Sequence, residues 1–596
     1  MSSRSGLGPV FAFEWLTRSR RWQGYALRGL FVLALLVALW LVWRSATGKQ
    51  SLTTRQQLAE AGAVFFATMT VIQLSLILLA APAATAGAIC LDKARGSLAH
   101  VMVTDLSDRE VVLGKLAARL VPVLNLIACA LPVAALGTLM GGIDPMALTG
   151  SFLIAVGVAL LGCSLALALS VWLTKTHEVM IVVFGLWTTW LMALPWCWMV
   201  SSGTWAPYWA ECSNPFWLAM APYSAPRRTS MVEPIVFFLA CLALSVGLAA
   251  LAVARLRPVY LHQADRVPKA VKDSKAAAWF RDQVRWWPGP SLDANPVLWR
   301  EWHRSRPSRV VRVVWGLYVA TTSVVSLMII HDCWNVDTPG LLGRVMGSVF
   351  NGFQVSIGLM LMAASAGTVL SEERVRGSLD VLLATPLSTP SIVRGKWWGA
   401  FRRAPWLAFW PTLIALATLP SNPPGRVVAF VYLIPVLILA QGAALAGLGL
   451  ALATWIPQTG RAATLTVVVL VVSIVGWPIV GSQMPVTSSS TNNQHLQTAV
   501  EMGSAFWNVG FTTNLIEQYR SQNGMPGPIT DGALLGLVGW GLIYASAAAG
   551  LFVATLLTFE RCLGRTSGRL GFAPHVPRDP RLKPVIPIEE LDEVMA

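Results

Sequence analysis

The sequence predicts an all-α, polytopic membrane protein built from two homologous six-helix transmembrane bundles. Three observations support this fold class. The chain has 596 residues, of which 55% are hydrophobic and only 12% charged, whereas soluble proteins carry about 25% charged residues. Apolar runs of about 18 or more residues recur, and each is long enough to cross a bilayer as a helix. A 21-residue segment occurs twice, which indicates an internal duplication.

Twelve membrane spans are expected, six in each half of the chain. The first six lie near 26–45, 62–90, 112–140, 147–174, 178–200 and 233–254. The second six lie near 310–331, 345–370, 400–419, 426–456, 460–482 and 533–557. We therefore expect a first permease-like half at 1–257, a linker at 258–293, a second half at 294–560 and a tail at 561–596. The tail is rich in proline and charge, which predicts disorder.

The distribution of Lys and Arg predicts the orientation of these spans. With the N-terminus inside, 37 of the 45 basic residues belong to inner segments and 8 to outer ones. This bias places the N-terminus, the linker and the C-terminus in the cytoplasm of a multi-pass plasma (inner) membrane protein. It also explains the net charge of +16 without nucleic acid as a partner. The first 22 residues lack a short apolar core with a cleavage site, so we expect no removable signal peptide.

The repeated segments run from Arg95 to Lys115 and from Arg376 to Lys396, and ten of their 21 positions are identical. Each lies between the second and third spans of its half. In the second copy, leucines at i, i+3 and i+4 predict a short amphipathic helix, and a proline ends it. A serine followed by proline then predicts the cap of the next helix. One interpretation is a plain hairpin, and the other is a docking helix for a soluble partner. The leucines, the proline and the capping pair are Leu379, Leu382, Leu383, Pro386, Ser388 and Pro390.

A second repeated pattern precedes the first span of each half. Pro9-Val10-x-x-x-Glu14-Trp15 matches Pro296-Val297-x-x-x-Glu301-Trp302, and arginines follow each copy. Aromatic and apolar residues with basic neighbours are typical of a helix that lies in the membrane interface. We expect Trp15 and Trp302 at headgroup depth, in contact with the lipid bilayer. The alternative is a positively charged flank.

Other polar residues give weaker signals. Gln73 and Gln354 occupy matching positions within spans, where interhelix hydrogen bonds or the lining of a transport path would explain them. Short re-entrant or interfacial helices are expected in the late outer segments, around Phe216-Trp217 and Phe506-Trp507. A disulfide between Cys212 and Cys333 is left open. No CxxC pair occurs, so no metal or redox centre is expected.

The second repeated segment resembles the cytoplasmic motif of type-2 ABC exporter permeases. The match runs from Glu372-Glu373 through Gly377-Ser378-Leu379-Asp380 to Gly395-Lys396, and the first copy resembles the motif more weakly. The resemblance implies that both segments dock on ATP-binding subunits. In the first half the docking residues are Arg95, Gly96, Ser97, Leu98, Thr104 and Leu106. In the second half they are Glu373, Arg376, Gly377, Ser378, Leu379, Leu382, Leu383, Thr385, Pro386 and Leu387.

The resemblance further implies a membrane subunit without enzymatic activity, which exports an unidentified substrate. The sequence has no phosphate-binding loop of the form GxxxxGK[ST]. ATP and magnesium are therefore expected on two copies of a partner subunit, with no cofactor bound by this chain. A secondary carrier with two six-span halves is the alternative, which the scarcity of charges within the spans disfavours. A membrane-embedded enzyme is disfavoured because no catalytic constellation is evident.

Overall fold

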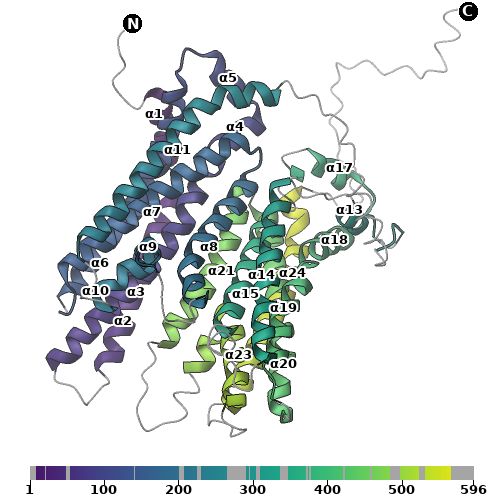
Figure 1. The fold of residues 1–596 in the computed structure, drawn as a ribbon. Helices are drawn as coiled ribbons and strands as arrows, with labels where there is room; N and C mark the ends of the chain where they lie inside the picture. Colours follow the sequence, from purple (N-terminus) through teal and green to yellow (C-terminus); the bar gives the residue numbers. More distant parts are fainter. Residues whose placement is uncertain are drawn as a thin grey trace, which may run out of the picture.

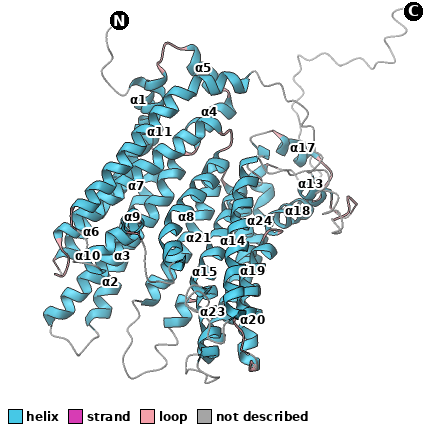
Figure 2. Ribbon diagram, in the orientation of Figure 1, coloured by secondary structure: helices cyan, strands magenta, loops and turns pink. Residues whose placement is uncertain are grey.

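The chain folds as an assembly of helices, most of them long and roughly parallel (Figure 1, Figure 2). We describe a computed structural model, in which the described residues form helices, turns and loops and no strands (Figure 2). This confirms the predicted all-α polytopic fold class. The structure describes residues 8–20, 22–47, 54–139, 141–200, 207–224, 230–264, 290–293, 295–303, 309–335, 347–368, 370, 373–374, 377–420, 423–456, 459–482, 497–521 and 530–564. Most of the predicted linker, the predicted tail from residue 565 and Arg376 lie outside these ranges.

The first part of the chain forms eleven helices within the described residues. A short helix precedes the first long one, and two very short helices follow α8. Their bounds are α1 Gly8–Ser19, α2 Trp22–Thr47, α3 Thr54–Thr85, α4 Gly87–Arg95, α5 Ser97–Val103, α6 Asp108–Thr138, α7 Pro145–Trp172, α8 Thr176–Val200, α9 Tyr208–Ser213, α10 Pro215–Ser224 and α11 Val232–Ala264.

The second part repeats this order, with a short helix, two long helices and a seven-residue helix before the third long stretch. Its bounds are α13 Pro296–His303, α14 Arg309–Asn335, α15 Gly347–Ala366, α17 Ser378–Ala384, α18 Thr389–Phe401, α19 Ala404–Ala417, α20 Gly425–Trp455, α21 Thr459–Ser482, α23 Ala505–Ser521 and α24 Thr530–Leu563.

Ten stretches of the described residues are long and apolar enough to cross a membrane, and they correspond to ten of the twelve predicted spans. The predicted span 178–200 is occupied by the helix α8. The prediction of one continuous span at 400–419 is wrong, because the helix breaks at Arg402 and Arg403 between α18 and α19. With 14 residues, α19 alone extends about 21 Å, less than the roughly 30 Å of a hydrocarbon core.

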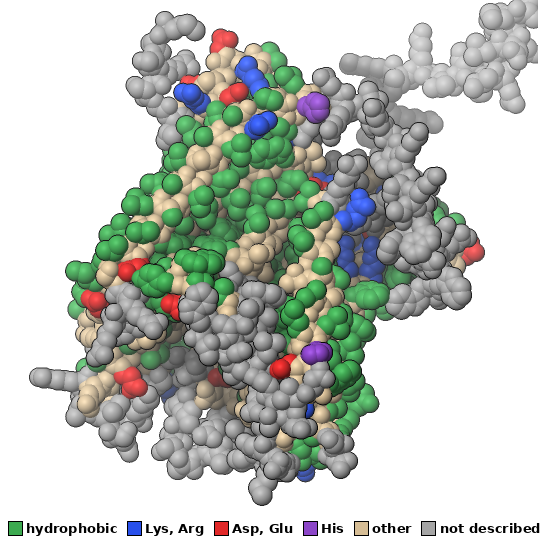
Figure 3. All heavy atoms as spheres, in the orientation of Figure 1, with side chains coloured by type: hydrophobic (Ala, Val, Ile, Leu, Met, Phe, Trp, Pro, Cys, Tyr) green, Lys and Arg blue, Asp and Glu red, His purple; other side chains and the backbone are tan. Residues whose placement is uncertain are grey.

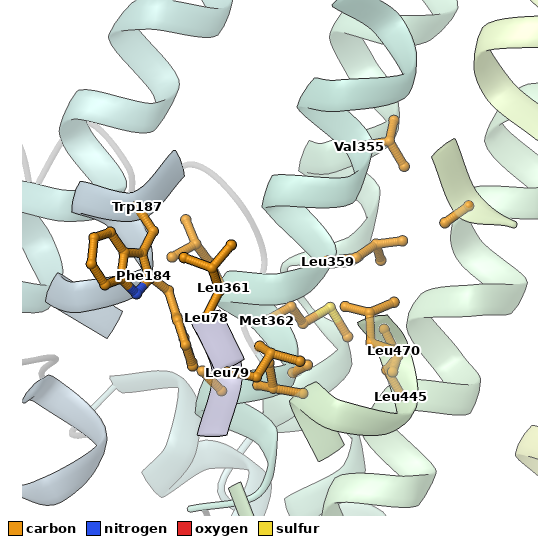
Figure 4. Packing of buried hydrophobic residues seen from close by; sticks show 14 of the residues in the cluster. Leu78, Leu79, Phe184, Trp187, Val355, Leu359, Leu361, Met362, Leu445 and Leu470 are labelled. Carbon is orange, nitrogen blue, oxygen red and sulfur yellow. The ribbon is translucent and has the colours of Figure 1, made fainter. Parts of the chain in front are cut away.

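One apolar core joins the two parts of the chain. Phe184 and Trp187 of α8 belong to the same buried cluster as Leu361 and Met362 of α15 (Figure 4). The helix α8 also contacts α14 and α21, and α21 contacts α3. Helices α8 and α21 therefore form the seam between the helices of the first part and those of the second (Figure 1). The surfaces of the long helices are largely hydrophobic, as expected for lipid-facing flanks (Figure 3).

Short helices occupy the two predicted outer segments. Helices α9 and α10 lie in the first, and α23 lies in the second. Phe216 and Trp217 donate their backbone N–H groups to Asn214 Oδ1, and Trp507 donates its own to Ser504 Oγ. The two aromatic pairs therefore stand at matching helix starts, each capped by a polar side chain. Cys212 and Cys333 both carry free thiols in the structure.

Candidate functional site

Both repeated segments adopt the same local structure. Each begins at a glycine with a left-handed backbone, Gly96 at φ 73° and Gly377 at φ 69°. A seven-residue helix follows in both copies, α5 and α17. Glycine adopts this conformation without the strain that a Cβ atom would cause, so it can turn the chain sharply into the short helix. Figure 1 shows α5 and α17 near the same end of the molecule.

The two short helices also end in the same way. Thr104 Oγ1 donates a hydrogen bond to the carbonyl of Val101, and Thr385 Oγ1 donates one to the carbonyl of Leu382, each at 2.6 Å. The backbone then becomes extended up to a serine cap, Ser107 in the first copy and Ser388 in the second. The predicted short helix, turn and next helix are thus confirmed for the second copy, where Ser388 occupies the N-cap position without a side-chain cap hydrogen bond, whereas Ser107 of the first copy forms a capping box with Glu110.

The apolar face of each short helix packs on its own chain. Leu98 is fully buried among residues of α6, α7 and α11. Leu379 and Leu382 are buried with Val297 and Phe559, and Leu383 and Leu387 pack against the same cluster. Leu98, Leu379 and Leu382, which were predicted to be docking residues, are therefore covered by their own chain, and Leu382 is only 8% exposed. The helical spacing revealed an apolar face but not which surface covers it.

The outer faces of α5 and α17 are exposed instead. Val103 is 87% exposed and Val381 is 70% exposed. The neighbouring positions His100, Asp105, Ala384 and Pro386 are exposed as well. Under the 281-residue offset of the repeat, His100 corresponds to Val381, Val103 to Ala384 and Asp105 to Pro386. Both copies therefore present the same three positions to the surroundings, with more apolar residues in the second copy.

A buried ion cluster lies beneath the first repeated segment. Lys115 Nζ of α6 lies 2.6 Å from Asp92 Oδ2 of α4 and 3.1 Å from Glu14 Oε1 of α1. Arg119 Nη2, one turn further along α6, lies 2.9 Å from Glu14 Oε2. Three elements thus meet at one cation: the short helix before the first span, the helix that leads into α5, and the span that follows it.

The second half contains the matching cluster. Lys396 Nζ of α18 lies 2.5 Å from Glu301 Oε1 of α13 and 2.7 Å from Glu373 Oε1. Arg300 Nη1 of α13 also approaches Glu373 Oε1, at 3.4 Å. The side chain of Lys396 is only 1% exposed. A charge that is so buried requires close partners, since an isolated ammonium would lose its hydration without compensation.

The two clusters are built from corresponding residues. Asp92 and Glu373 are 281 positions apart, as are Lys115 and Lys396, and Glu14 and Glu301 are 287 apart. Sequence reasoning singled out most of these residues separately and did not connect them. The sequence did contain a signal for the clusters, because each half has two acidic residues and one lysine at corresponding positions. In each half the cluster fastens the start of the repeated segment to the helix that follows it.

The short helices α1 and α13 are the predicted interfacial helices, and each packs on the third long helix of its half, α6 or α18. Phe13 and Leu16 of α1 are largely exposed, as a membrane-facing surface requires. Trp302 of α13 is partly exposed and has the guanidinium of Arg402 5.7 Å from its ring centroid. The headgroup depth of Trp15 and Trp302 stays a prediction.

Gln73 and Gln354 are both buried within the helices, but their surroundings differ. Gln354 Nε2 donates to Asn351 Oδ1 at 2.5 Å, and Ser326 Oγ of α14 donates to Gln354 Oε1 at 3.4 Å. The predicted interhelix hydrogen bond is thus confirmed for Gln354. Gln73 Nε2 is buried and has no hydrogen-bond partner among the described residues. The structure assigns neither residue to a transport path.

Comparison with known proteins adds one family. Residues 263–559 match the family model of the ABC-2 family transporter protein. No curated protein matches the chain. The matched residues include α13, the ion cluster around Lys396, the short helix α17 and the long helices up to α24. This match gives the second half an ABC-2 transporter domain, and with the ten apolar stretches it supports a multi-pass membrane protein of the ABC transporter permease type.

Proposed function

We propose that this chain carries two permease halves of an ABC exporter, driven by ATP that a separate subunit hydrolyses. The observation that carries the proposal is the repeated arrangement of α5 and α17, each with an exposed outer face and a buried ion cluster beneath it. Two equivalent surfaces at one end of the molecule fit two copies of one soluble partner (Figure 1). ATP and magnesium belong to that partner.

The docking surface that we propose uses the exposed positions of the short helices. In the second half these are Val381, Ala384 and Pro386, and in the first half they are His100, Val103 and Asp105. A partner groove that covers Val381 would remove an exposed apolar side chain from water, which stabilises a complex by about 1.5–3 kcal/mol. The buried residues Leu98, Leu379 and Leu382 position these helices.

The ion clusters suggest how movement passes from partner to membrane. A displacement of α17 by the partner would move Glu373, which forms an ion pair with Lys396 of α18. The same lysine holds Glu301 of α13, so the short helix before the first span follows. We propose that α17, α13 and α18 move as one unit, and that α5, α1 and α6 do so in the first half. The substrate is not identified by these residues.

Orientation follows from the same proposal. The ATP-binding subunit is cytoplasmic, so α5, α17 and the linker face the cytoplasm of a plasma (inner) membrane protein. This agrees with the division of 37 inner and 8 outer basic residues. A secondary carrier of the same span number has no need of a docking surface.

Co-purification tests the docking surface. V381R and V103R place a charge on the proposed contacts while leaving the buried leucines intact. V232R is the matched control, because Val232 is similarly exposed but lies at the start of α11, at the opposite end of the molecule (Figure 1). We expect V381R combined with V103R to lose the ATP-binding subunit, and V232R to retain it. Retention of the subunit by the V103R/V381R double variant would reject the docking surface.

A further inference from the structure

The break between α18 and α19 holds a cation that the first half lacks. Arg403 stands between Phe401, the last residue of α18, and Ala404, the first of α19. The 281-residue offset aligns Arg403 with Pro122, which lies inside the continuous helix α6. The nearby arginine of the first half, Arg119, is paired with Glu14 at 2.9 Å. The second half thus departs from the repeat at this point.

The direct contacts of Arg403 are with neutral groups, and the Glu301 carboxylate acts on it only from a distance. Its Nη1 donates to Ser365 Oγ of α15 at 2.8 Å, and its guanidinium carbon lies 5.3 Å from the ring centroid of Trp315 in α14. Among the described residues no carboxylate lies within ion-pair distance of it. The acidic side chain of this region, Glu301, is held by Lys396. A partly buried guanidinium with one neutral acceptor retains several N–H donors for another acceptor.

A second unsatisfied donor lies beside it. The indole N–H of Trp315, the ring that Arg403 approaches, is buried and has no hydrogen-bond partner among the described residues. Buried donors are nearly always paired in folded proteins, so an orphan donor calls for an explanation such as a missing ligand. Two adjacent donors, one of them cationic, select an acceptor that carries negative charge.

The surroundings indicate where that acceptor comes from. Trp398 precedes the break and Trp406 follows it, and both are substantially exposed. Arg402, next to Arg403, donates to the carbonyl of Glu301 at 2.9 Å and lies near Trp302. Exposed tryptophans around a pair of arginines are typical of the level of lipid headgroups.

We propose that the α18–α19 break, with Arg403 and the indole N–H of Trp315, binds the phosphodiester group of an anionic lipid. The lipid phosphate accepts from both donors and neutralises a cation that forms no ion pair with the described residues. The site belongs to the second half only. It therefore makes the permease sensitive to the lipid composition of one leaflet through the helix α19, which contacts α14, α15, α20 and α23. Because it rests on these contacts alone, the proposal does not depend on the docking surface.

Thermal unfolding of the full chain in neutral detergent, with added phosphatidylglycerol or phosphatidylcholine, tests the site. We expect phosphatidylglycerol to raise the midpoint of the wild type, and R403Q to abolish most of that gain. W315F removes only the indole N–H and should lose part of it. R394Q is the matched control, because Arg394 is exposed on α18 and the same charge is removed. It should keep the gain.

Native mass spectrometry of the same variants measures the binding. The loss of a charge-assisted hydrogen-bonding partner should weaken retention of phosphatidylglycerol about tenfold in R403Q, with no change for phosphatidylcholine. In lipid-free detergent R403Q already loses the hydrogen bond to Ser365 Oγ and the contact with Trp315, so the quantity compared is the gain on adding phosphatidylglycerol and not the starting midpoint. Equal retention by wild type and R403Q would overturn the proposal. A full stabilisation by inorganic phosphate alone would overturn the assignment to a lipid.

Discussion

Lys396 should be the most sensitive single position of the coupling region. In K396M the carboxylates of Glu301 and Glu373 lose a cation that lies 2.5 and 2.7 Å away. With an effective dielectric constant of about 20, a pair at that separation is worth about 6 kcal/mol before desolvation. Desolvation of the lysine offsets part of this, and the expected net cost of removing one member of a buried pair is about 3–5 kcal/mol.

The corresponding lysine of the first half provides the matched comparison. In K115M, Glu14 keeps Arg119 at 2.9 Å, and the side chain of Asp92 is 24% exposed and can be solvated. We therefore expect K115M to cost about 1–3 kcal/mol. The Glu373 side chain is only 9% exposed, so K396M leaves a carboxylate that water reaches poorly. The two variants make the same chemical change in two different environments.

Thermal unfolding of the full chain in detergent measures the difference, with a reporter near α17. K396M should lower the midpoint more than K115M, because Glu373 then keeps only Arg300, at 3.4 Å and about half exposed. The double variant K396M/E373Q should recover a large part of the loss, because the buried carboxylate that lost its lysine is then neutral. The reasoning is refuted if K115M is the more damaging variant. It is also refuted if E373Q gives no recovery, because the cost would then come from lost packing of the lysine stem.

Three further predictions follow from other parts of the structure. G377A should destabilise α17 and weaken partner binding, since a side chain at φ 69° costs about 1–2 kcal/mol; G425A, with equally open space around its added Cβ and ordinary helical backbone, should be neutral or stabilising, and equal unfolding midpoints would disprove the backbone argument. Q354L should lower the unfolding midpoint, whereas Q73L should not, because only Gln354 satisfies a network with Asn351 and Ser326; the reverse order would contradict this. Cysteines introduced at positions 100, 270 and 380 should react with an impermeant maleimide only after the cells are opened, and labelling of intact cells at any of them would overturn the topology.

The sequence was sufficient for the long helices and for the shape of the repeated segments. Hydropathy located ten spans, and the glycine, leucines and proline of the repeat defined α17 between Gly377 and Thr385. These features depend on residues close together in the chain, which local patterns can reveal. The hydrophobic window could not detect the break at Arg402 and Arg403, since two charges near the edge of a predicted span resemble an ordinary flank.

The ion clusters could not be predicted from local sequence patterns, because their members are far apart in the chain. Lys115 and Glu14 are 101 positions apart, and Lys396 and Glu301 are 95 apart. A charge is assigned to a solvated flank by default, and only the fold shows that α13 lies against α18. The surface that covers the leucine face of α17 could not be predicted for the same reason. Periodicity established that Leu379 and Leu382 share a face, but the neighbours that bury them, Val297 and Phe559, come from distant segments.

The central claim is that α5 and α17 transmit movement, driven by ATP hydrolysis on a separate subunit, to the membrane helices. The most direct test is the ATPase rate of four samples in lipid vesicles: the chain alone, the ATP-binding subunit alone, their complex, and the complex with V103R/V381R. We predict no hydrolysis by the chain alone, stimulated hydrolysis in the complex, and loss of that stimulation in the double variant. Hydrolysis by the chain alone, or undiminished stimulation in the double variant, would contradict the account.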